Sequence, residues 1–109
     1  MADEARIEVV DDREKRRFEI RVDGELAGFA DYSRRGGRLI FRHTEIDDAF
    51  EGRGLGSKLA QGALDAARAG GEAVVPLCPF VASYIEKHPE YEDLVDQECL
   101  EYLDRPRGS

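Results

Sequence analysis

The segment Glu51–Lys58 has the residue types and spacing most suited to chemistry. It reads Glu-Gly-Arg-Gly-Leu-Gly-Ser-Lys, with glycines at alternate positions. Alternating glycines let a backbone turn sharply and approach a ligand closely. A helix is expected to begin at once, and the free N–H groups at a helix start attract anions. The segment predicts an anion site suited to a pyrophosphate, with Arg53 and Lys58 adding positive charge. The alternative is a flexible glycine loop with an ordinary helix cap.

Two familiar phosphate-binding motifs do not match this segment. A P-loop has Gly-Lys followed by Ser or Thr, whereas the order here is Gly56-Ser57-Lys58. The dinucleotide fingerprint spaces its glycines as G-x-G-x-x-G after the first strand of a parallel sheet, whereas the spacing here is G-x-G-x-G. The remaining use of a strand, glycine loop and helix to hold a pyrophosphate is the binding of coenzyme A.

Cys78 is the residue best suited to be a nucleophile. It lies between Leu77 and Pro79, after a short apolar stretch and near an expected helix start. A thiol at a helix N-terminus can become nucleophilic. The alternative is that Cys78 is a small apolar core residue, as buried cysteines commonly are. Cys99, in an acidic stretch, is interpreted as structural or incidental.

The elements that position these groups follow from two hydrophobic periods. The first part of the chain alternates apolar and polar residues: Phe18, Ile20 and Val22 share one face, and Glu19 and Arg21 face the other way. This period predicts four strands, near residues 7–9, 18–22, 25–32 and 38–46. Hairpin turns at residues 23–24 and 33–37 would make them antiparallel neighbours.

Beyond the glycine segment the period becomes helical. Leu55 to Ala69 carry an apolar stripe, and Gly62 within it indicates that another element packs close. Gly70-Gly71 end this helix, and a short strand at residues 73–77 follows. A second helix is expected at residues 79–87, with His88 capping its end. Four strands, a helix, a strand and a helix predict an α+β fold with one β-α-β crossover.

Length and composition limit the possible classes of protein. The chain has 109 residues, the size of a single domain, with 41% hydrophobic and 37% charged residues. We expect a core over about residues 5–95 and an acidic C-terminal tail at 96–109, partly docked through Leu94, Val95, Leu100 and Leu103. The net charge of −8 argues against binding to DNA or to an anionic membrane.

The sequence shows few features of a membrane helix, a signal peptide or a metal site. No apolar run approaches the roughly 20 residues of a membrane helix. The start Met1-Ala2-Asp3-Glu4 lacks the order of a signal peptide. Two cysteines are too few for a disulfide scaffold, and no cluster has metal-ligand spacing, so we expect no metal and a reduced, cytoplasmic location. The oligomeric state is left open.

Three stretches together resemble the GNAT superfamily of N-acetyltransferases, and within it the small, single-domain YjdJ-like subgroup. They are residues 43–46 (His-Thr-Glu-Ile), 52–59 (Gly-Arg-Gly-Leu-Gly-Ser-Lys-Leu) and 75–91, which includes Pro-Leu-Cys-Pro-Phe. The resemblance covers roughly residues 5–95, in the order that this architecture expects. The family's glycine motif usually opens with Gln or Arg, and Glu51 stands at that position here.

The resemblance implies transfer of an acetyl group from acetyl-CoA to an amine. The implied coenzyme-binding residues are Ile46, Gly52, Arg53, Gly54, Leu55, Gly56, Ser57, Lys58 and Phe80. A backbone N–H near Glu45 or Ile46 would polarise the thioester carbonyl.

Four residues are candidates for the chemical steps. Cys78 would lie by the acetyl group and could carry it covalently. Tyr84 matches a tyrosine that protonates the departing thiolate in many family members; the alternative is aromatic packing on the sheet. Glu45 is a candidate base or a solvated strand-end charge. His43, expected on one face with Glu45, Leu39 and Phe41, is a titrating group near the acceptor or a structural histidine.

The acceptor is left open by the sequence. The acidic balance favours a cationic small-molecule or peptide amine. The alternative function is a non-catalytic module that binds acetyl-CoA or regulates a partner.

Overall fold

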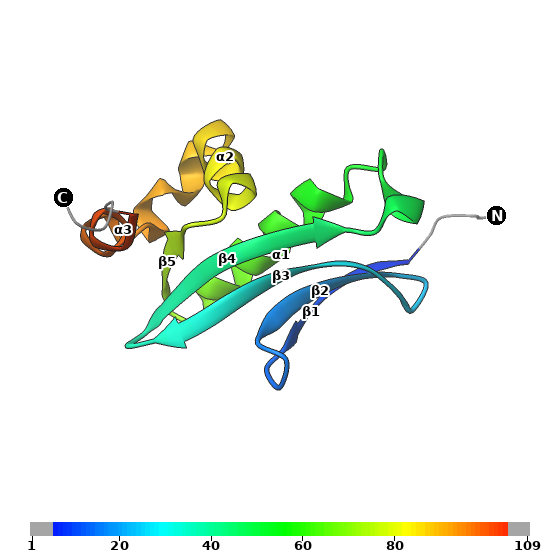
Figure 1. The fold of residues 1–109 in the computed structure, drawn as a ribbon, viewed down its shortest axis with the longest axis horizontal. Coiled ribbons are helices and arrows are strands. Elements are labelled where there is room, and N and C mark those ends of the chain that lie inside the picture. Colours follow the sequence, from blue (N-terminus) through cyan, green and yellow to red (C-terminus); the bar gives the residue numbers. More distant parts are fainter. Residues whose placement is uncertain (1–5, 105–109) are drawn as a thin grey trace.

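A five-stranded sheet, with strands in sequential order, is the scaffold of the chain (Figure 1). The structure is a computed structural model and describes residues 6–104. The strands are β1 (Ile7–Asp12), β2 (Arg17–Val22), β3 (Glu25–Arg35), β4 (Arg38–Ile46) and β5 (Ala73–Pro76). The first four are antiparallel neighbours, and β5 runs parallel to β4. The predicted meander and crossover are confirmed.

Three α-helices and two 3-10 segments complete the fold. They are η1 (Asp48–Phe50), α1 (Leu55–Ala69), α2 (Pro79–Lys87), η2 (Pro89–Leu94) and α3 (Gln97–Asp104). The bounds of α1 and α2 agree with the helical patterns in the sequence. The predicted fold class, α+β with a β-α-β crossover, is therefore correct.

The first predicted hairpin turn is found at the predicted residues, whereas the second is shorter than predicted. Asp23 and Gly24 both have positive φ, 53° and 86°, as a two-residue turn requires. The second turn is shorter than the predicted residues 33–37. Gly36 and Gly37 take φ of 55° and 80°, so strand pairing continues to Arg35 opposite Arg38. Two consecutive glycines can make the whole turn, which lets β3 extend further than its hydrophobic pattern indicated.

A bulge in β4 changes which of its residues share a face. Asp31 pairs with His43 and Tyr32 with Phe41, so Arg42 is an extra residue in β4. An extra residue shifts the alternation of side chains by one. Leu39 and Phe41 therefore face the core, whereas His43 and Glu45 are exposed on the opposite face. The prediction that these four residues share a face is wrong.

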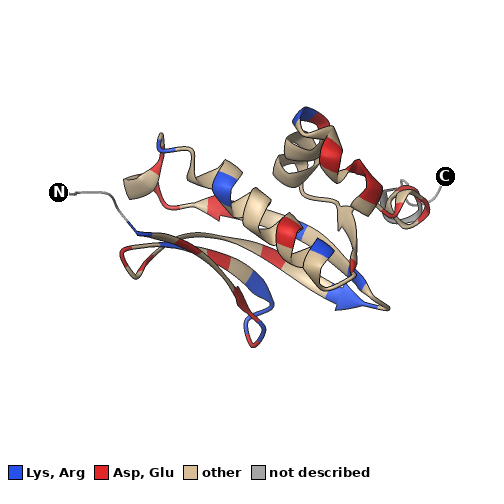
Figure 2. Ribbon diagram, turned by 180° about the vertical axis from the view of Figure 1, so that it is seen from behind, with Lys and Arg blue, Asp and Glu red and all other residues tan. Residues whose placement is uncertain are grey.

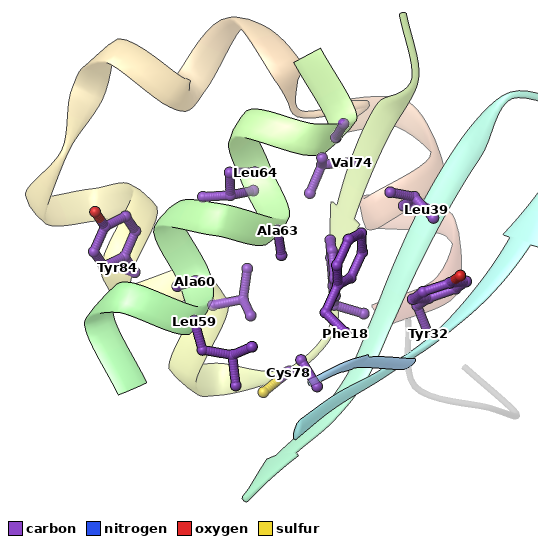
Figure 3. Close-up of a cluster of buried hydrophobic side chains, with 14 of the residues drawn as sticks. Phe18, Tyr32, Leu39, Leu59, Ala60, Ala63, Leu64, Val74, Cys78 and Tyr84 are labelled. Carbon is purple, nitrogen blue, oxygen red and sulfur yellow. The ribbon is translucent and has the colours of Figure 1, made fainter. Parts of the chain in front are cut away.

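The core lies between α1 and one face of the sheet. Phe18 of β2, Leu39 of β4, Leu59 and Leu64 of α1 and Val74 of β5 are almost completely buried there (Figure 3). Gly62 lets α1 approach β1, because a Cβ at this position would lie 2.8 Å from Val9. The close approach that the sequence indicated is present.

Glu19 is the one charged side chain buried among the described residues. It lies on the sheet face opposite the core and is only 3% exposed. Arg17 contacts one of its carboxylate oxygens at 2.9 Å and Arg21 the other at 2.6 Å. Burial alone would raise the pKa of Glu19, but the hydrogen bonds from Arg21 and Arg17 outweigh burial and lower it. The alternation of apolar and polar residues predicted that Glu19 faces away from the core. It did not predict that Arg17 and Arg21 would bury its carboxylate.

The C-terminal segment is more ordered than a partly docked tail. Val95 forms a bridge with Val74, and Asp96 N–H donates to the Val74 carbonyl at 2.9 Å, so this segment extends the sheet beside β5. Leu94 is buried and Val95 is partly buried against the core. The side chain of Leu103 and residues 1–5 and 105–109 lie outside the described part of the chain.

Candidate functional site

A pocket of about 330 Å³ lies at the N-terminus of α1. Most of the residues that the sequence assigned to coenzyme binding line it together: Ile46, Gly52, Gly54, Leu55, Gly56, Ser57 and Phe80. Phe50 and Glu51 complete the lining. The pocket thus brings the end of β4, the glycine segment and the start of α2 to one place.

The glycine segment leaves its backbone open toward solvent. Gly52 and Gly54 have φ of 85° and 71°, and a Cβ at either position would have no protein atom within 4 Å. Gly54 is the N-cap of α1 and offers no side-chain cap. The first helical bond runs from Lys58 N–H to the Gly54 carbonyl at 3.3 Å, so the N–H groups at residues 55–57 precede the helical ladder. These amides form a positive, uncapped helix end.

Phe80 links the two helix starts. A Cβ at Gly56 would lie 2.5 Å from Cζ of the Phe80 ring, so only glycine allows this contact. Phe80 is 42% exposed although it is a large hydrophobic residue. The ring therefore forms an apolar wall of the pocket that remains accessible.

The charged groups around the pocket are of both signs. Arg53 does not line the pocket; its guanidinium lies 5.3 Å from the centre of the Phe50 ring. Lys58 is exposed on the first turn of α1 and also lies outside the lining. Glu51 is exposed and does line the pocket, so a negative charge borders the open amides. In Figure 2 both red and blue segments occur at the loop before α1 and in the first part of α1.

The strands β4 and β5 separate next to this pocket. Their parallel pairing ends at Phe41 opposite Pro76, and Cys78 N–H donates to the Phe41 carbonyl at 3.0 Å. Beyond this point β4 continues to Ile46, whereas the segment that follows β5 turns away into α2 (Figure 1). The last part of β4 therefore has one edge that β5 does not cover.

Cys78 lies where β4 and β5 separate and is the N-cap residue of α2. It is 3% exposed, and its Sγ lies 3.2 Å from Thr44 Oγ1 on β4. The thiol therefore contacts the part of β4 that β5 does not cover. Figure 3 shows Cys78 near Leu59 of α1. Sequence reasoning missed Thr44, because the bulge at Arg42 decides which face it occupies.

Glu45 and His43 lie together, but on the other face of β4 from Thr44. Glu45 Oε2 and His43 Nε2 are 3.1 Å apart, and both side chains are more than half exposed. Glu45 also lines a small pocket of about 100 Å³ with Phe29 and Asp47. The structure thus pairs these two candidates with each other and not with the Cys78 thiol.

Tyr84 lies on α2, six residues after the N-cap residue Cys78. It is buried, its ring stacks on His88 with centres 4.0 Å apart, and Tyr91 lies 6.0 Å away. Burial raises the pKa of Tyr84, and the negative charges of Glu90 and Asp65 raise it further. His88 is the C-cap of α2, as expected, and its Nδ1 lies 2.9 Å from the Tyr84 carbonyl oxygen.

The described residues hold neither a metal cluster nor a membrane span. Within residues 6–104, no three His, Cys, Asp or Glu side chains are grouped so that they could hold a metal ion. No helix in the same part of the chain is long and apolar enough to cross a membrane.

The fold and the site together define a class: an α+β protein with a glycine loop opening a helix beside two separating parallel strands. A family model described as GCN5-related N-acetyltransferase matches residues 17–94. The chain therefore belongs to the GCN5-related N-acetyltransferase family. It is similar to Protein NATD1 of Gallus gallus and of Mus musculus, each 32% identical over 85 residues, which are 76% of this chain and 77% of the relative. Protein NATD1 of Homo sapiens is also 32% identical, over 75% of its length.

Proposed function

We propose that the chain is an N-acetyltransferase that uses acetyl-CoA and transfers the acetyl group to an amine. One observation carries the proposal. The pocket beside the open amides is lined by Ile46 at the end of β4 and by Phe80 at the start of α2, and the contact between Thr44 and Cys78 joins the same two elements. A carrier held in the pocket would extend its reactive end along β4 toward this contact.

The residues of the pocket fit the diphosphate of such a carrier. The space beside Gly52 and Gly54 is empty of protein atoms, and a helix N-terminus favours a negative group there. Phe80 offers an apolar surface to an aliphatic arm. When bound, acetyl-CoA supplies an activated acetyl thioester.

The chain's own groups would then orient the reacting centre. The N–H of Asp47 donates to the Ala27 carbonyl of β3, so the N–H of the preceding residue, Ile46, points to the other edge of β4. There β5 no longer pairs with β4, so the N–H of Ile46 is suited to polarise a carbonyl. Cys78 would line the acetyl end of the site, with Thr44 fixing its thiol. Positioning alone can supply much of the rate in such a transfer.

The acceptor in this proposal is a cationic amine, which the net charge of −8 attracts. Glu45 lies on the outer face of β4, opposite Thr44, so it would accept the amine proton through water. We place the reaction in the cytoplasm, where Cys78 and Cys99 would remain free thiols.

A non-catalytic acetyl-CoA-binding module is the second candidate. Glu51 on the pocket lining and the nearly complete burial of Cys78 favour it. It predicts binding without acetyl transfer to any amine in a panel that includes polyamines and lysine peptides.

Binding is tested by thermal melts of the wild type and Gly54→Val with acetyl-CoA. At about 100 times the dissociation constant, the ligand should add about 2.7 kcal/mol to the stability of the wild type. The valine side chain would enter the space proposed for the diphosphate, so Gly54→Val should show no ligand-dependent shift. Gly37→Val is the matched control, because Gly37 has a φ of 80° and open space but lies in the β3–β4 turn. A ligand shift retained by Gly54→Val would refute the loop assignment.

A further inference from the structure

A further pocket, of about 400 Å³, lies at the opposite end of the sheet from the glycine loop. Its lining is strongly basic: Arg13, Arg16, Tyr32, Ser33, Arg34 and Arg35. No carboxylate of residues 6–104 lines it, although Asp11 contacts two of the lining residues, Arg13 at 3.3 Å and Arg34 at 3.5 Å. We call this feature the arginine pocket.

The arginine pocket arises from unequal strand lengths. Pairing between β2 and β3 begins at Arg17 opposite Asp31, and one further bond joins Tyr32 N–H to the Arg16 carbonyl at 3.0 Å. From Ser33 onward β3 pairs with β4 alone and extends past the turn between β1 and β2 (Figure 1). The resulting step in the sheet places side chains of that turn opposite side chains from the end of β3.

The floor of the pocket is held rigidly. Arg34 donates to Glu72 from Nε at 2.6 Å and from NH2 at 3.1 Å, and it donates from NH1 to the Tyr32 hydroxyl at 3.0 Å. The Tyr32 hydroxyl donates in turn to Asp11. Most donor directions of Arg34 are thereby used within the protein, so Arg34 shapes the floor and is not free to move toward a ligand.

The rim of the pocket carries the available donors. Arg13 is 73% exposed and contacts one carboxylate, that of Asp11, at 3.3 Å through Nε. Within residues 6–104, Arg16 and Arg35 have no carboxylate contact of this kind. Figure 2 shows the basic residues of the β1–β2 turn and of the end of β3 as separate blue segments of one end of the sheet.

Each guanidinium group can donate two parallel N–H bonds to the oxygens of a phosphate or a carboxylate, and a diphosphate carries more negative charge for several such groups than a single carboxylate. We propose that the arginine pocket binds a diphosphate group, with Arg13, Arg16 and Arg35 as its ligands and Arg34 as a fixed positive floor. The concave shape and the side chains of Arg16 and Arg35, which make no ion pair with a carboxylate within residues 6–104, support a ligand with several negative charges.

This site is distinct from the pocket proposed for acetyl-CoA. α1 has 15 residues, about 22 Å at its rise per residue, and the two pockets lie near its opposite ends. Glu72, which follows the C-terminus of α1, contacts the floor of the arginine pocket. The inference therefore does not depend on the proposed acetyltransferase function.

Titration calorimetry with inorganic pyrophosphate tests the site, using the wild type, the double variant Arg16→Gln/Arg35→Gln and the control Lys87→Gln. Lys87 is an exposed cation on α2, outside both pockets. The double variant should bind at least about tenfold more weakly, whereas Lys87→Gln should bind like the wild type. Raising the salt from about 0.05 M to 0.5 M should weaken binding to the wild type. Equal affinity of the double variant and the wild type would overturn the proposal.

The glycine loop could itself hold pyrophosphate, so the same titration is repeated with Gly54→Val. Binding that survives Gly54→Val and is lost in the arginine variant supports the site. If Gly54→Val loses pyrophosphate binding and the double arginine variant retains it, the proposed site is wrong. The double variant should still show the thermal shift with acetyl-CoA, which also confirms that it is folded.

Two further ligands, ADP and adenosine, test whether the phosphates or the nucleoside of a nucleotide are recognised. ADP binding at least as tightly as pyrophosphate, with no binding of adenosine, supports recognition through the phosphates. Adenosine binding as tightly as ADP would contradict it.

Discussion

At the scale of single residues, the contact between Thr44 and Cys78 joins β4 to the start of α2. The thiol is nearly buried, and its hydroxyl partner occupies one side of it. In the proposed complex Cys78 would lie beside the acetyl end, and its burial leaves an amine little access to the sulfur. The geometry thus favours a residue that lines the site over a covalent carrier of the acetyl group.

We accordingly expect Cys78→Ala to reduce the rate of acetyl transfer by less than about tenfold. Mass spectrometry of the wild type incubated with acetyl-CoA should show no acetylated Cys78. A loss of several hundredfold, together with acetylated Cys78 in the wild type, would instead establish a covalent step. Thr44→Val tests the positioning of the thiol and should mimic Cys78→Ala.

Glu51 gives a second prediction at this scale. Its carboxylate lines the pocket proposed for a diphosphate, so the two negative charges should repel each other. Glu51→Gln should tighten acetyl-CoA binding by about two- to fivefold at low salt and by less at high salt. Glu98→Gln, which removes an exposed carboxylate of α3, is the control and should leave the affinity unchanged. Weaker binding by Glu51→Gln would show that Glu51 contributes to the site.

At the scale of secondary-structure elements, the fit of α1 against β1 depends on Gly62 and Val9. A Cβ at Gly62 would lie 2.8 to 2.9 Å from three side-chain atoms of Val9, so the helix and strand would have to separate. Replacing glycine by alanine in a helix gains about 1 kcal/mol from propensity, which works in the opposite direction. Overpacking a close contact costs about 1–3 kcal/mol, so the steric effect should prevail.

A double-mutant cycle checks this balance. Gly62→Ala should lower the free energy of unfolding by about 1 kcal/mol in denaturant titrations. Val9→Ala removes the obstructing side chain and should also destabilise the protein. Combined, the two substitutions should destabilise less than the sum of their single effects. Additive effects would mean that the contact does not limit the approach of α1 to the sheet.

The β4 strand shows how one element decides the chemistry of its residues. Without the bulge at Arg42, Glu45 and His43 would face the core with Leu39 and Phe41. With it, Thr44 reaches Cys78, while Glu45 and His43 pair on the outer face. An extra residue in one strand therefore separates the thiol from the candidate base.

At the scale of the whole molecule, ion pairs tie distant parts of the chain together. Arg34 joins β3 to Glu72 before β5, Arg38 joins β4 to Asp96, and Arg68 joins α1 to Asp93. The hydrogen bond from Arg34 lowers the pKa of Glu72, and those from Arg38 and Arg68 lower the pKa of Asp96 and Asp93. A carboxyl group with a lowered folded-state pKa stabilises the fold above its unfolded pKa.

The resulting prediction is a loss of stability in acid. The contribution of Glu72 should be complete above its unfolded pKa of about 4.3 and should disappear as the pH falls through its lower folded value. Glu72→Gln should reduce stability at neutral pH by about 1–2 kcal/mol and should flatten the decline below about pH 4. Chemical denaturation between pH 7 and pH 3 measures both effects. Glu98→Gln should retain the slope of the wild type, and an unchanged slope in Glu72→Gln would contradict the assignment.

The sequence by itself determined the elements and the loop. The bounds of β4, α1 and α2, the Asp23-Gly24 turn and the close approach at Gly62 all follow from local propensity and hydrophobic period, which depend on neighbours along the chain. The glycine segment was recognisable for the same reason, because positive φ and a helix start are local properties. η2 and α3 carry weaker local signals: the sequence predicts no helical segment at η2, and α3 falls within the predicted acidic tail.

Only the tertiary structure decided which functional candidates meet. The bulge in β4 depends on the register with β3, the contact between Thr44 and Cys78 on the separation of β4 and β5, and the arginine pocket on the different lengths of β2 and β3. The place of Tyr84 beside His88 and Tyr91 depends on how η2 folds back against α2. Register, strand separation and docking arise from contacts between residues far apart in the chain, and a pattern read along one strand or helix contains no information about its partner.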